Sequence, residues 1–217
     1  PSWKSLPRLS ASFDQLVIRG ANLTVLRPDA NHLEIGGIRF ALDGGGKSDA
    51  AQQFADWLFE QGEVLILDSR LTWIDSSRNA PPLPLSNVNI ALRNTLLTHR
   101  AALTATPPAT FGGRIDLRAN FRQPLFLRHT ADFARWTGTL YGDLPGVDLT
   151  ALQRQAPVRL PLQISAGRGS VRAWVQIADL APTAVTADLA LRSLNVQMAA
   201  QASPLVGHPE TAAASVG

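Results

Sequence analysis

The segment from Ala41 to Ser48, which reads Ala-Leu-Asp-Gly-Gly-Gly-Lys-Ser, most resembles a catalytic motif. It matches a relaxed phosphate-binding loop, in which backbone amides cradle phosphates, Lys47 reaches the β/γ oxygens and Ser48 holds Mg²⁺. However, Ala41 stands where that loop has its first glycine, and no repeated helices follow residue 62, as a parallel nucleotide-binding sheet requires. We therefore interpret the segment as a glycine turn before a helix cap. Nucleotide binding at residues 41–48 is kept as an alternative.

No other grouping of reactive side chains predicts catalysis. His32, His99, His129 and His208 are scattered without metal-ligand spacing, and the chain has no cysteine. We predict no catalytic residue, no metal and no cofactor, so the protein is not expected to be an enzyme. A net charge of +3 without a clustered basic run also predicts no nucleic-acid partner.

Polar and apolar residues alternate through most of the chain, which predicts β-strands. Between Arg114 and Arg122 the alternation is complete, and it places Ile115, Leu117, Ala119 and Phe121 on one face. Similar segments predict strands at 16–27, 33–42, 64–74, 86–94, 98–105, 113–122, 136–141, 158–165, 170–178 and 185–198. We expect a bulge at Gly36-Gly37 and a shift of apolar phase at Arg192-Ser193.

Helices are few in the predicted architecture. Residues 49–61 carry Phe54, Trp57 and Leu58 at helical spacing, which predicts an amphipathic helix packed on the sheet. A short helix is expected at Leu149–Gln155. The fold class is therefore mainly β: a long, curled antiparallel sheet that forms an open groove and carries one packed helix.

Composition indicates a folded chain, with 45% hydrophobic and 17% charged residues. We expect an irregular entry segment at 1–15, a groove segment at 16–200 and a flexible tail at 201–217. Because the chain starts at Pro1 without a methionine, we expect it to be a stretch of a longer protein.

Several stretches resemble the YhdP family of AsmA-like proteins. Phe54–Gln61, followed by Val64–Asp75 with its Leu-Thr-Trp-Ile-Asp ending, resembles the family's helix and following strand. Gly112–Ala119, Trp136–Tyr141 and Gly169–Trp174 look like its repeated strand motifs. The resemblance covers roughly residues 16–198.

The resemblance implies a non-catalytic function in lipid transfer. Such proteins are anchored in the inner membrane of Gram-negative bacteria, cross the periplasm and are thought to carry phospholipid to the outer membrane. It implies phospholipid acyl chains as the ligand, membrane contact through parts outside this chain and a periplasmic location. It names no protein partner.

Burial of acyl chains agrees with the residue pattern, since each CH₂ moved from water to an apolar surface contributes about 0.8 kcal/mol. The candidate groove-lining residues share the apolar phase of their strands: Ile115, Leu117, Phe121, Leu160, Leu162, Ile164, Val171, Val175, Ile177, Leu189 and Leu191. The sequence does not say which face is concave, so this set could instead pack under the helix. A ligand-free, structural or adhesin-like β-sandwich is a further alternative.

Overall fold

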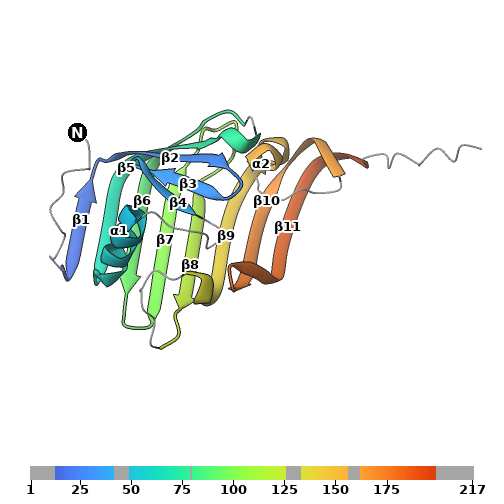
Figure 1. Cartoon of the computed structure of the whole chain (residues 1–217). Coiled ribbons are helices and arrows are strands. Elements are labelled where there is room, and N and C mark those ends of the chain that lie inside the picture. The colour runs from blue at the N-terminus through green and yellow to red at the C-terminus, as the bar shows by residue number, and fades with distance from the viewer. Residues whose placement is uncertain (1–12, 42–48, 79, 126–132, 156–161, 199–217) are drawn as a thin grey trace, which may run out of the picture.

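The computed structural model describes residues 13–41, 49–78, 80–125, 133–155 and 162–198, which form one open sheet of eleven strands (Figure 1). The strand order is β11-β10-β9-β8-β7-β6-β5-β2-β3-β4, and β1 also pairs with β5. The mainly β, open fold that the alternation predicts is confirmed. The strands are β1 (Gln15–Arg19), β2 (Asn22–Asp29), β3 (His32–Ile35), β4 (Ile38–Ala41), β5 (Glu63–Asp75), β6 (Leu83–Asn94), β7 (Thr98–Thr106), β8 (Ile115–Arg122), β9 (Thr137–Asp148), β10 (Leu162–Ala178) and β11 (Ala181–Met198).

Strands β5 to β11 form an antiparallel meander, as expected, but β1 and β2 run parallel to β5. Strand β1 pairs with the first half of β5 and β2 with the second half, separated by Gly20 at φ 66°. The chain returns from β4 to β5 through helix α1 (Asp49–Glu60), because a parallel pairing needs a crossover connection.

The expected bulge at Gly36-Gly37 is wrong. Both glycines have positive φ, 60° and 83°, and they form the turn of a hairpin between β3 and β4. A two-residue hairpin turn of this kind needs positive φ at both positions, which glycine adopts without steric cost. The predicted strand at 33–42 is therefore two short strands.

Strand β10 joins two predicted strands into one. It runs from Leu162 to Ala178 and passes Gly167 at φ 154°, where the pairing with β11 shifts register. The predicted phase shift at Arg192-Ser193 coincides with this irregularity, since Ser193 has φ 51°. Strand β9 extends to Asp148, beyond the predicted end at Tyr141.

Helix α2 (Leu149–Gln155) follows β9 directly, where the short helix was expected. Asp148 caps it: one carboxylate oxygen accepts hydrogen bonds from the backbone amides of Thr150 and Ala151, both at 3.0 Å. The hydrogen bond from the Thr150 hydroxyl, and after it these amide hydrogen bonds, lower the pKa of Asp148. The cap holds α2 against the end of β9.

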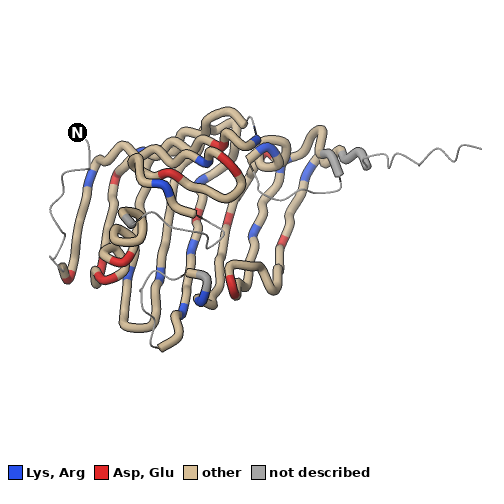
Figure 2. The backbone as a smooth tube through the Cα atoms, viewed as in Figure 1, with Lys and Arg blue, Asp and Glu red and all other residues tan. Residues whose placement is uncertain are grey.

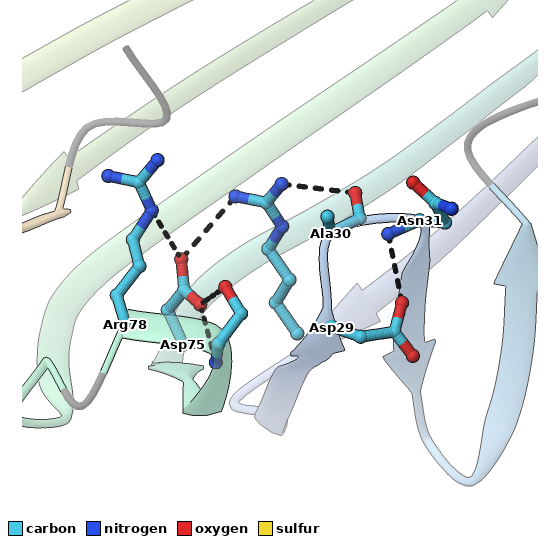
Figure 3. A network of polar contacts seen from close by, with 7 residues as sticks. Asp29, Ala30, Asn31, Asp75 and Arg78 are labelled. Atoms are coloured by element: carbon cyan, nitrogen blue, oxygen red, sulfur yellow. Dashed lines mark hydrogen bonds and ion pairs between the residues drawn. The ribbon is translucent and has the colours of Figure 1, made fainter. Parts of the chain in front are cut away.

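A buried polar network ties β2 to the end of β5 (Figure 3). The Asp75 side chain is fully buried; its Oδ2 lies 3.4 Å from Nη1 of Arg27 and 3.6 Å from Nε of Arg78. Its Oδ1 accepts hydrogen bonds from the amide and hydroxyl of Ser77. The network therefore stabilises the last residue pair of the parallel β2–β5 pairing, where the short 3-10 helix Ser76–Arg78 begins.

Candidate functional site

The sheet has one continuous apolar face, built up strand by strand from the pairing register. Leu117 on β8 pairs with Leu103 on β7 and with Gly142 on β9. Val175 on β10 pairs with Leu140 on β9 and with Val185 on β11. Since residues directly opposite in a sheet point to the same side, these apolar side chains share one face.

Helix α1 and strands β2–β4 cover part of this face near the N-terminal strands (Figure 1). Phe59 of α1 makes edge contacts with His99 on β7 and with Trp136, at centroid distances of 5.2 and 5.1 Å. Phe54 of α1 meets Phe40 of β4 at 6.3 Å. The prediction that the apolar stripe of this helix packs on the sheet is confirmed.

The C-terminus of α1 is held by side-chain amides. Asn94 donates hydrogen bonds to the carbonyls of Leu58 and Gln61, at 3.2 and 2.8 Å, and its own oxygen lies 2.9 Å from Nδ1 of His99. His99 is buried, stacks on Trp136 at 4.3 Å, and burial lowers its pKa. The helix is thus anchored to β6 and β7.

A hydrophobic cluster covers one end of the apolar face, under α2. Phe111, Ile115, Val147 and Leu149 are its buried members. Residues packed against it include Leu144, Leu152, Ile164 and Val171. This end of the apolar face is covered by the protein's own side chains.

Outside these two coverings, the apolar face of β8–β11 is uncovered. Leu117 is 41% exposed, Leu140 37%, Val185 65%, Leu189 58% and Leu191 38%. Large apolar side chains that share one face and remain exposed mark a binding surface. This surface, the uncovered face, is the candidate functional site.

The predicted lining residues fall into groups. Leu117, Leu189 and Leu191 lie on the uncovered face, with Val175 and Ile177 half-buried beside them. Ile115, Ile164 and Val171 pack in the cluster under α2, and Phe121 lies 6.1 Å from Trp136. Leu162 belongs to β10, and Leu160 lies outside the described residues. That this set contacts lipid stays a prediction.

Sequence reasoning did not single out three further exposed apolar residues, Leu140, Val185 and Leu194. Leu194 is 44% exposed. Val185 belongs to the same alternation as Leu189 and Leu191, so the pattern itself contained that signal. Leu140 could be recognised as part of the uncovered face only from its pairing with Val175.

The described residues give little support to nucleotide binding or to another catalytic function. Residues 42–48 of the phosphate-loop segment lie outside the described residues. Asp68, in the strand after the helix, is exposed and pairs with Arg19 at 3.1 Å. Among the residues that the structure describes, no group of three or more His, Asp or Glu side chains could hold a metal ion. Within the same ranges, no helix combines the length and apolar character needed to cross a membrane.

An open sheet with one partly uncovered apolar face defines a β-groove protein. The chain belongs to the YhdP family: the family model described as YhdP protein matches residues 1–210. Comparison with curated proteins and with solved structures produced no match.

Proposed function

We propose that the uncovered face holds phospholipid acyl chains and that the chain is a non-catalytic part of a lipid-transfer groove. The exposed apolar surface across β8–β11, represented by Leu117, Leu140 and Leu189, carries this proposal. Family membership supports it, since the YhdP resemblance implies phospholipid transfer between the inner and outer membranes. The location that follows is the periplasm, within an inner-membrane-anchored protein of a Gram-negative bacterium.

The physical mechanism is passive. Each methylene group of an acyl chain that leaves water contributes about 0.8 kcal/mol, and this driving force has no direction along the face. Neighbouring strands lie about 4.8 Å apart, so the four uncovered strands span roughly 15 Å. A tail can therefore move from one strand to the next without a chemical step.

The partial covering distinguishes the groove from a closed β-sandwich. In a sandwich, a second sheet buries the apolar face along its whole width. Here β11 is exposed from Ala181 to Asn195, and Val185 and Leu189 on its apolar side are 65% and 58% exposed. This observation favours a surface that binds a ligand over one that only stabilises the fold.

The test is native mass spectrometry of the purified chain, followed by lipid extraction. We compare the wild type with Leu189→Asp on the uncovered face and with Ala190→Asp, its neighbour on the opposite face of β11. We expect phospholipid with the wild type and Ala190→Asp, and a loss of most of it with Leu189→Asp, because a buried carboxylate opposes tail binding.

Two results would contradict the proposal. One is a lipid-free wild type that also takes up no lipid from added liposomes, which would favour a purely structural role for the sheet. The other is equal lipid retention by both variants, which would show that the uncovered face is not where tails bind.

A further inference from the structure

The face opposite the apolar one contains an open cavity of about 340 Å³ over β6–β9. Basic residues recur on these neighbouring strands in the middle of the sheet (Figure 2). The polar and aromatic side chains at the cavity are Arg93, Arg100, Arg118, Asn120, Thr139 and Tyr141. No acidic residue is among the described residues that line it.

The register explains how the hollow forms. Ala91 on β6 and Ala102 on β7 are directly opposite each other, so methyl groups form its floor. The next residue across from Ala102 is Arg118, which in turn pairs with Tyr141. Small side chains in the middle and long ones around them leave a concave surface on an otherwise flat sheet.

Two arginines face each other across the cavity edge. Arg93 and Arg100 are direct cross-strand partners, an arrangement that is destabilising for like charges. Arg100 continues into a row of donors, because it pairs with Asn120, which pairs with Thr139. A guanidinium, an amide and a hydroxyl thus lie side by side on three neighbouring strands.

The protein's own acidic residues neutralise only some of the arginines at the cavity. Arg93 Nε lies 2.6 Å from Glu63, and Arg118 makes a two-pronged contact with Asp116 at 2.7 and 3.1 Å. Within the described part of the chain, no ion pair compensates Arg100. The cavity therefore keeps an unbalanced positive charge at Arg100.

We propose that this cavity binds the phosphate group of a phosphate monoester that carries a small apolar substituent. Arg100 makes the main contact, since a guanidinium matches two phosphate oxygens at once. Asn120 and Thr139 are in place to donate to a third oxygen, which a carboxylate lacks. The substituent rests on the alanine floor beside the Tyr141 ring, which Arg118 overlies at 5.7 Å.

Titration with phenyl phosphate, followed by amide NMR of the chain, tests this site. We expect saturable shifts centred on Arg100, Ala102 and Asn120, and an affinity that falls with added salt because the site is exposed. The variant Arg100→Gln should weaken binding about tenfold. Thr139→Val, which keeps the shape of the side chain, should weaken it less.

Arg192→Gln is the matched control, since Arg192 is an exposed arginine on β11, far along the strand order. Equal weakening in Arg192→Gln would overturn the site in favour of general charge attraction. Benzoate bound as tightly as phenyl phosphate would overturn the phosphate assignment, and inorganic phosphate bound as tightly would overturn the role of the floor. Absence of saturable shifts would overturn the whole proposal.

This inference does not rest on the lipid groove. The variant Leu189→Asp lies on the other face, so it should lose lipid yet keep its phenyl phosphate binding. The two proposals can therefore fail separately.

Discussion

Arg27 Nη1 lies 3.4 Å from Oδ2 of Asp75, with 15% of the Arg27 side chain exposed and none of the Asp75 side chain. The pair joins a strand near the N-terminus to the last residue of β5, across a parallel pairing. Removing one partner from a buried ion pair leaves the other charge uncompensated, which is costly. The relationship therefore gives a direct test of what holds β2–β4 in place.

We expect Asp75→Ala to lower the free energy of unfolding by about 3 kcal/mol, measured by urea denaturation. The variant leaves the Arg27 guanidinium without its carboxylate partner and also removes the acceptor for Ser77. Arg39→Ala is the control, because Arg39 lies 3.9 Å from Glu34 in an exposed pair and should cost less than about 1 kcal/mol. Equal losses would show that the Asp75 network does not stabilise β2.

Gly138 permits the close approach of β8 and β9 next to Phe121, which contacts Trp136. A Cβ at this position would collide with the backbone oxygen of Asn120 and lie 2.5 Å from Cδ1 of Phe121. We expect Gly138→Ala to destabilise the fold by about 1–3 kcal/mol, measured by thermal or urea unfolding.

Gly142→Ala is its matched control on the same strand and the same face. There the nearest atom to a Cβ is Cδ2 of Leu117, at 3.3 Å, and an exposed leucine can rotate away. This variant should stay within about 1 kcal/mol of the wild type. A Gly142→Ala variant as unstable as Gly138→Ala would refute the close-approach argument.

His99 should make the stability of the protein depend on pH. Burial lowers its pKa below the ordinary value of 6.5, so the unfolded chain binds the proton more readily. The contribution is fully present above pH 6.5 and is lost as the pH falls from there through the folded-state pKa. The slope for this one proton stays below about 1.4 kcal/mol per pH unit.

Melting temperatures recorded from pH 7.5 to pH 5 check this expectation. His99→Phe keeps an aromatic ring against Trp136 and should flatten the pH dependence. A curve for His99→Phe that parallels the wild type would assign the pH dependence to another group.

Local patterns in the sequence were sufficient to predict most strands and both helices. The alternation at 114–122 predicted β8, and the apolar spacing of Phe54, Trp57 and Leu58 predicted α1. The phase shift at Arg192-Ser193 also marked a real irregularity of β11. These features succeeded because side-chain periodicity follows from the backbone of a single element.

Those local patterns could not predict which strands pair with one another in the sheet. The Gly36-Gly37 step is compatible with a bulge or with a hairpin, and the choice depends on whether β4 folds back on β3. The parallel pairing of β1 and β2 with β5 likewise depends on where α1 carries the chain.

By itself, the sequence determined a mainly β chain and, within most strands, which residues share the apolar face. Only the tertiary structure decided which of them are covered, as Ile115 is by the cluster under α2, and which stay exposed, as Leu189 does. The physical reason is that periodicity reports the side to which a residue points. Exposure depends instead on segments distant in the chain that pack on that side.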